Sequence, residues 1–397
     1  EFLNKMTPPQ RFGLIASTVG GHAFKHLFNA AFFVILPEIK FGLGLTNIQI
    51  GSLSTVRNMA GGISNLPAGF AADRFSRRRP EILGISIILL GLFSALLGTS
   101  NSYLWAIFAS GLITATISFW HPAAISTLSQ YFQTRRGFAI AIHGTGGSVG
   151  EFLGPIVAGT LIGFFSWRIV LQGSAVPAVG AGILIWMSLR FALKQELSSS
   201  NVNSYVSSFL NLMKNRRLLL LLLFAGGFSA GQSAVLTFLP IYLREELMVS
   251  SFQLGLYLSL AQLAGIGSQP LLGFLSDKYG RKSVLAPGLL CLGFSFLGLY
   301  LVPFGWPFFT VILAMGIFLF PMMAILLAGA MDLVEPQVQA TTVSLVFGSA
   351  ILLAGLSPAI AGIFADAFGI KSTFLWAAGI TLATSTTAFI THWERYD

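Results

Sequence analysis

Glycine, proline and charged residues divide this chain into twelve apolar stretches, each long enough to cross a bilayer. A helix needs roughly 20 mostly apolar residues to cross the hydrocarbon core. Of the 397 residues 54% are hydrophobic and only 9% are charged, whereas an ordinary soluble domain is about one-quarter charged. A soluble enzyme and a disordered or fibrous chain are therefore excluded. The expected spans are 12–36, 47–70, 82–100, 103–131, 137–163, 168–190, 217–243, 252–274, 283–302, 306–331, 340–366 and 370–392.

The one long polar stretch, from Lys194 to Arg217, separates six expected spans from six. It predicts an N-terminal bundle over 1–193, a cytoplasmic linker over 194–216 and a C-terminal bundle over 217–397. The first apolar stretch is longer than the core of a signal peptide, so we expect it to be a retained span.

The basic residues gather on one set of loops. The opposite loops hold only Lys40, Arg168, Arg244 and Lys371. This asymmetry predicts that both termini lie in the cytoplasm, with the chain in the inner or plasma membrane. It also accounts for the net charge of +9 without a nucleic-acid partner.

Two landmarks occur twice in the chain. The loop from Gly69 to Arg78 reads GFAADRFSRR, and that from Gly273 to Lys282 reads GFLSDKYGRK, at an offset of 204 residues. Pro155 in the fifth span and Pro358 in the eleventh are 203 residues apart. Two nearly equal offsets indicate that the halves are structural copies.

These loops resemble the doubled signature G-x-x-x-D-[RK]-x-G-[RK]-[RK] of the major facilitator superfamily, with Ser76 in place of a glycine. The resemblance implies an all-α membrane protein of twelve transmembrane helices in two pseudo-symmetric six-helix bundles. We interpret Arg78 and Arg79 as topology determinants only. The predicted gating residues are Gly69, Asp73, Arg74, Arg77, Gly273, Asp277, Lys278 and Arg281.

A narrower resemblance is to the fosmidomycin-resistance branch of drug exporters. It is carried by GHAFKHLFN from Gly21 to Asn29, by SFWHP ending at Pro122, and by the glycine-rich fifth span. That branch commonly has an acid after the asparagine, where this chain has Ala30.

Ionisable residues at membrane depth are costly and usually carry function. His22, Lys25, His26 and Asn29 follow a spacing of i, i+3, i+4 and i+7, so they share one face of the first helix. The superfamily resemblance places such residues around a central pocket, which would be net positive. The predicted substrate-binding residues are His22, Lys25, His26, Asn29, Arg57, His121, Gln232 and Gln262.

Structural roles are the alternative at several of these positions. His121 precedes Pro122 and could satisfy a carbonyl freed at a kink. His143 fits a structural or interfacial role, and Arg57 with Glu151 could form a static buried pair. His22 and His26 also have metal-ligand spacing, but Lys25 beside them would repel a cation, so we predict no metal site. A membrane-embedded metal enzyme is kept as an alternative.

The fifth span resembles the antiporter motif of the superfamily, with Gly150, Gly154, Pro155 and Gly159 at its glycine and proline positions. Small residues at this spacing also occur wherever helices approach closely, so general helix packing is the alternative.

Together these features predict a transporter rather than an enzyme, moving a small anionic or amphipathic organic solute by alternating access. Glu151, the only acid at membrane depth, is the expected proton carrier, with His26 as the second candidate. Antiport and export are favoured; an importer or exchanger of a small carboxylate or phosphonate is the alternative. We expect a monomer with no cofactor besides the proton gradient, in contact with solute and membrane lipid but not nucleic acid.

Overall fold

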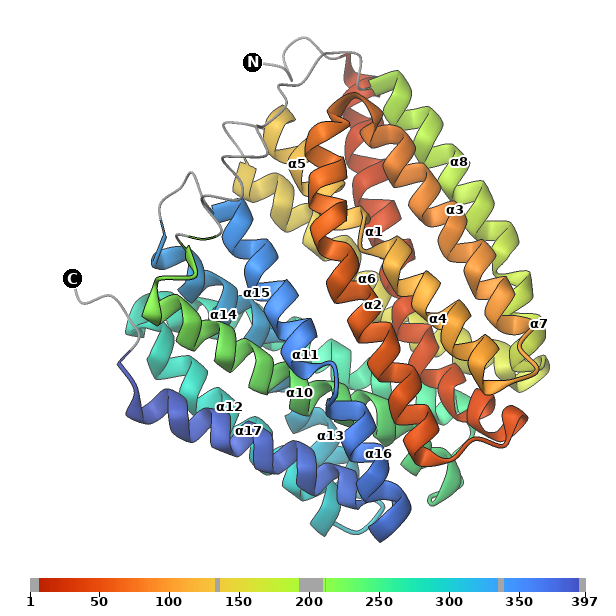
Figure 1. Ribbon diagram of the computed structural model, residues 1–397, viewed down its shortest axis with the longest axis vertical. Helices are drawn as coiled ribbons and strands as arrows, with labels where there is room; N and C mark the ends of the chain where they lie inside the picture. The colour runs from red at the N-terminus through yellow and green to blue at the C-terminus, as the bar shows by residue number, and fades with distance from the viewer. Residues whose placement is uncertain (1–6, 133–135, 193–209, 211, 335–338, 393–397) are drawn as a thin grey trace. The chain divides into compact units, whose positions relative to one another are not determined.

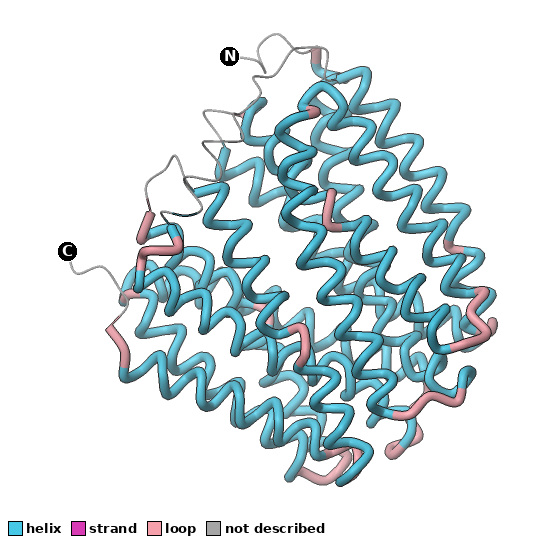
Figure 2. The backbone as a smooth tube through the Cα atoms, in the orientation of Figure 1, coloured by secondary structure: helices cyan, strands magenta, loops and turns pink. Residues whose placement is uncertain are grey.

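The computed structural model describes residues 7–132, 136–192, 210, 212–334 and 339–392. In these ranges the regular structure is helical, without strands (Figures 1 and 2). Most of the predicted linker 194–216 lies outside the described residues. The helices are α1 Pro8–Leu43, α2 Asn47–Arg74, η2 Ser76–Arg78, α3 Arg79–Gly98, α4 Tyr103–Ile117, α5 Trp120–Tyr131, α6 Arg136–Phe164, α7 Trp167–Gly173, α8 Ala175–Ala192, α10 Arg216–Glu245, α11 Ser251–Tyr279, α12 Arg281–Leu301, α13 Trp306–Leu319, α14 Pro321–Asp332, α15 Gln339–Ala354, α16 Ser357–Phe368 and α17 Ser372–Ile390.

The predicted all-α membrane fold is confirmed. Among the described residues, eleven helical stretches are long and apolar enough to cross a membrane. The remaining expected span is α2, a 28-residue helix that carries Arg57 and Asn58. With α2 the helices account for the twelve expected spans.

Four of the expected spans are broken into two helices each, which hydropathy alone does not predict. The breaks fall at Ser118–Phe119, Ser174, Phe320 and Gly355–Leu356. Proline stands in the first turn after each of them, as Pro122 of α5, Pro177 of α8, Pro321 of α14 and Pro358 of α16. Proline is tolerated there because the first amide groups of a helix have no intrahelical partner.

The chain divides into two compact units. One comprises residues 1–35 with 60–202, and the other comprises 36–59 with 203–397. The second unit therefore includes the end of α1 and the beginning of α2, which the predicted boundaries assign to the N-terminal bundle. The contacts that hold 36–59 in the second unit are described below.

Each unit contains the same close helix pair. In the first, α3 packs on α8, where a Cβ on Gly91 would lie 2.3 Å from the Cβ of Ala178. In the second, α12 packs on α17, where a Cβ on Gly293 would lie 2.6 Å from Leu382. Gly91 and Gly293 are 202 residues apart, so the internal repeat extends to the packing of the helices.

Candidate functional site

A cluster of imidazoles, one ammonium and one carboxylate lies inside the first unit. Helix α1 contributes His22, Lys25 and His26, α5 contributes His121, and α6 contributes Glu151. The α1 members share one face because they are three and four residues apart. His22 and Lys25 are each only 6% exposed.

The hydrogen bonds of the cluster have one consistent direction. Lys25 Nζ lies 2.9 Å from His121 Nδ1, and an ammonium can only donate. A neutral His121 then donates through Nε2 to His22 Nε2, 3.0 Å away. His22 Nδ1 donates to the carbonyl oxygen of His143 at 2.7 Å. The bonds thus form a chain from Lys25 through His121 and His22 to the backbone of α6.

His143 packs against this series of hydrogen bonds. Its ring stacks on that of His22 with centroids 3.9 Å apart, and its Nδ1 donates to the carbonyl oxygen of Thr18 at 3.0 Å. With 2% exposure it is buried. This environment agrees with the structural interpretation of His143 rather than with an interfacial one.

His26 and Glu151 form a hydrogen-bonded pair beside this chain. His26 Nδ1 donates to Glu151 Oε1 over 2.8 Å, with 18% and 30% of the two side chains exposed. The other ring nitrogen of His26, Nε2, is buried and has no hydrogen-bond partner among the described residues. Glu151 thus pairs with α1 inside its own unit.

Glycines of α6 bring that helix against α1 and so position the cluster. A Cβ on Gly150 would lie 2.0 Å from the carbonyl oxygen of Ala23, and one on Gly154 would lie 2.4 Å from that of Leu27. Both would strike backbone, which cannot swing away. Gly159 is buried on the same helix, and α6 continues through Pro155 without a break.

Three imidazoles of the cluster have the spacing of a metal site. One ring nitrogen from each of His22, His26 and His121 lies within 4.8 Å of the others. Lys25, bonded to His121, opposes a divalent cation here by charge repulsion. That repulsion supports the prediction of no metal, which stays a prediction.

Four further residues are predicted to bind substrate. Asn29 is half-buried on α1. Arg57 and Gln262, each 5% exposed, and the half-buried Gln232 belong to the second unit. Their assignment to substrate binding also stays a prediction.

The signature loop of the second unit forms a network of charges. Arg281 Nε donates to Asp332 Oδ2 at 2.8 Å and Nη1 to Ser276 Oγ at 2.8 Å. Arg281 also pairs with Asp277, four residues earlier. Lys278 lies over the ring of Tyr279. The arginine thereby connects the end of α11 to the end of α14.

The first signature loop reaches a similar connection through a different arginine. Arg79 is 1% exposed; its Nε donates to Ala72 O at 2.9 Å and its Nη1 to Gln130 Oε1 at 2.6 Å. Arg79 is therefore held inside the protein by these bonds, and its assignment as a topology determinant stays a prediction. The short helix η2 follows Arg74 and precedes Arg79.

A register shift explains why the sequence motif pointed elsewhere. Arg79 and Gln130 are both 202 residues before Arg281 and Asp332, whereas the aligned motifs differ by 204. The motif alignment therefore matched Arg77, which is exposed, to Arg281. The side chain of Asp73 lies outside what the structure describes.

Comparisons with known proteins agree with this architecture. The family model described as Major Facilitator Superfamily matches residues 18–349 and 227–396. The fosmidomycin resistance protein of Escherichia coli is 24% identical over 386 residues, covering 96% of this chain and 93% of that protein. The cis,cis-muconate transport protein of Acinetobacter baylyi is 24% identical over 69% of this chain and 71% of its own length.

Solved structures show the same fold. A bacterial homologue of the human lysosomal transporter Spinster, in an inward-facing and occupied conformation, superposes with a TM-score of 0.80 at 17% identity, over 97% of this chain and 96% of the other. The nucleoside transporter NupG gives a TM-score of 0.75 at 15% identity, over 96% and 100% of the two chains.

Proposed function

Because this chain belongs to the Major Facilitator Superfamily and is a membrane transporter rather than an enzyme, we propose that it moves a small organic anion by proton-coupled alternating access. The observation that carries the proposal is the His26–Glu151 pair at 2.8 Å beside the Lys25–His121 bond at 2.9 Å. A cation and a proton-binding acid are thereby held close together within one unit.

Lys25 and His26 are the groups that would meet the anion. An ammonium has three donors, and the bonds to His121 leave donor capacity for a carboxylate or phosphonate oxygen. Protonated His26 would donate from Nε2, the nitrogen for which the described part of the chain supplies no hydrogen-bond partner. Both contacts would be charge-assisted, which roughly doubles the strength of a hydrogen bond.

Glu151 gives the coupling. While it is ionised it accepts the hydrogen bond of His26 and competes with the substrate anion for positive charge. Protonation of Glu151 would release His26 to bind the substrate. The proton and the anion would therefore influence each other's binding reciprocally.

Two substrate classes follow from the relatives. The fosmidomycin resistance protein suggests export of a phosphonate, and the cis,cis-muconate transport protein suggests import or exchange of a dicarboxylate. The glycine and proline positions of α6 resemble those of antiporters and favour export, whereas a proton that promotes anion binding favours movement of both in the same direction. The direction in which a pH gradient drives transport decides between them. We further propose that the protein acts as a monomer in the plasma membrane with both termini in the cytoplasm, following its basic loops.

Proteoliposomes containing the full chain test these roles. Uptake and counterflow of cis,cis-muconate and fosmidomycin are measured with and without a pH gradient, for the parent and for Glu151→Gln, Lys25→Gln and the exposed control Glu246→Gln. We expect Glu151→Gln to retain counterflow but lose the response to the gradient. Lys25→Gln should weaken substrate affinity by about tenfold or more, the loss of one charge-assisted bond.

Full gradient-driven transport by Glu151→Gln would refute the coupling role. Unchanged affinity in Lys25→Gln would refute the anion site. Thermal unfolding of each variant separates both results from misfolding.

A further inference from the structure

Two ion pairs join α1 to the end of α10. Arg244 Nη2 and Nε lie 2.6 and 3.0 Å from Glu38 Oε1, and Lys40 Nζ lies 2.6 Å from Glu245 Oε2. All four residues belong to the second unit. On α1 the negative Glu38 precedes the positive Lys40, whereas on α10 the positive Arg244 precedes the negative Glu245. Both pairs therefore form together only when the two helices are aligned in this register.

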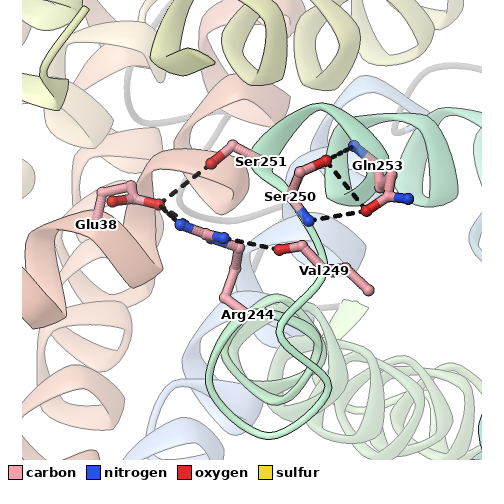
Figure 3. Close-up of polar contacts among 6 residues, drawn as sticks. All are labelled: Glu38, Arg244, Val249, Ser250, Ser251 and Gln253. Carbon is pink, nitrogen blue, oxygen red and sulfur yellow. Dashed lines mark hydrogen bonds and ion pairs between the residues drawn. The ribbon is translucent and has the colours of Figure 1, made fainter.

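Glu38 also reaches the beginning of α11 (Figure 3). Ser251 Oγ donates to Glu38 Oε1 at 3.2 Å, and Arg244 Nη1 donates to the carbonyl oxygen of Val249 at 2.7 Å. A capping box formed by Ser250 and Gln253 stabilises the turn between α10 and α11. One carboxylate of α1 thus contacts both helices that meet at this turn.

A second set of contacts holds the beginning of α2 against α16. The carboxylate of Asp366 accepts the backbone N–H groups of Asn47 and Ile48 at 3.0 and 2.9 Å. These are amides of the first turn of α2, which have no intrahelical partner. A Cβ on Gly362 would lie 2.6 Å from Asn47 O, and one on Gly51 would lie 2.1 Å from Pro358 O.

The ion pairs give a reason for two basic residues that lie in loops otherwise poor in positive charge. Lys40 and Arg244 are two of the four basic residues expected on the sparsely charged side. Of the Lys40 side chain 10% is exposed, and of Glu245 36%. A lysine this buried needs a partner, while the exposure of Glu245 leaves the pair open to water. Such a pair can separate and be hydrated again.

We propose that Glu38–Arg244 and Lys40–Glu245, with the Asp366 cap, form a lock that closes the end of the second unit opposite its signature loop. In the closed lock, residues 36–59 are held on α10, α11 and α16. Opening it exposes that end to solvent and gives the other access state. This rests on alternating access as proposed above, and it assigns the closing contacts to these residues.

Charge reversal at one pair tests the lock without any substrate. Lys40→Glu and Glu245→Lys each place like charges together, and the double variant restores an attractive pair in reverse. Glu246→Lys makes the same charge change one residue away, at an exposed position, and is the matched control. All are made with Cys291→Ser, which removes the exposed native cysteine.

The readout is labelling of a cysteine placed at Ser54. Ser54 is 4% exposed and lies in the 36–59 segment, and serine to cysteine changes its size little. A membrane-impermeant maleimide is applied to intact cells and to inverted vesicles. We expect each single reversal to raise the labelling rate about five- to tenfold in one orientation, the shift that loss of a partly buried pair supports. The double variant should return towards the parent rate, and Glu246→Lys should not change it.

Parent-like labelling in both single variants would overturn the lock. So would a folded double variant that labels as fast as the singles. If a reversal prevents folding, Lys40→Gln and Glu245→Gln remove the attraction without repulsion and are expected to raise labelling less. Because no solute is transported in this assay, a wrong substrate class would not change its outcome.

Discussion

Gly150 of α6 gives the sharpest test of how the cluster is positioned. A Cβ at this position would lie 2.0 Å from Ala23 O, 2.8 Å from Ala23 C and 2.9 Å from Leu27 N. Ordinary contact begins near 3.4 Å, so the alanine variant must separate α1 from α6 locally by about 1.4 Å, the difference from 2.0 Å. All three atoms are backbone, so no side-chain rotation relieves the contact.

The expected cost follows from overpacking. Forcing an extra methyl group into a close-packed site costs about 1–3 kcal/mol. Alanine also gains up to about 1 kcal/mol over glycine from helix propensity, which would hide part of the loss. Gly144→Ala is the matched control, because it lies on the same helix and its Cβ would meet nothing within 4 Å. The difference between the two variants isolates the overpacking.

Thermal unfolding in one detergent, followed by tryptophan fluorescence, measures this difference. We expect Gly150→Ala to melt about 2 °C or more below Gly144→Ala. The separation would also lengthen the 2.8 Å His26–Glu151 bond beyond hydrogen-bonding range, so coupling should weaken along with stability. Equal melting temperatures, or a higher one for Gly150→Ala, would refute the close approach of α1 and α6.

Three further predictions concern stability and use the same thermal assay. Arg79→Ala should cost about 1–3 kcal/mol by leaving buried acceptors unsatisfied, while the exposed Arg78→Ala should stay within about 0.5 kcal/mol; equal effects would contradict the buried network. Asp366→Ala should cost about 0.5–2 kcal/mol as a lost helix cap, and an unchanged melting temperature would count against the cap. Gly316→Ala, whose Cβ would lie 2.1 Å from Ala261 O, should lower the melting temperature relative to Gly267→Ala, which has open space; the reverse order would argue against the α11–α13 contact.

Features that depend on local periodicity could be predicted from the sequence. Length and apolar content predict the membrane helices, because a bilayer imposes one length on all of them. The spacing of His22, Lys25 and His26 predicts a shared face, because helical geometry depends only on position along the chain. The small residues around Gly150 and Gly154 likewise mark a helix contact before the partner helix is known.

Features that depend on a partner far away in the sequence could not be predicted. Lys25 donates to His121, 96 residues away, and Lys40 pairs with Glu245, 205 residues away; nothing near either lysine specifies that choice. The contacts of Arg79 could not be predicted for another reason, since two residues of register around η2 shift its alignment with the second half. Its burial follows from tertiary packing, which a loop motif does not encode.

The border between the units crosses α1 and α2 at positions where both helices are weak. In α1 the border after residue 35 falls beside Pro37, whose missing N–H removes a helical hydrogen bond. In α2 the partners change within two residues: Met59 lies against Gly355 of the second unit, while the carbonyl of Gly61 accepts from Ser118 of the first. Gly61 and Gly62 follow the border directly, and paired glycines lower the cost of bending a helix. The lock therefore lies on a segment that is joined to the first unit at two positions where the helices can bend. Opening can occur by breaking the ion pairs, or by bending at these two positions with the ion pairs intact. Charge reversal distinguishes them, because bending would leave the ion pairs closed and the labelling of Ser54→Cys independent of the charges at Lys40 and Glu245.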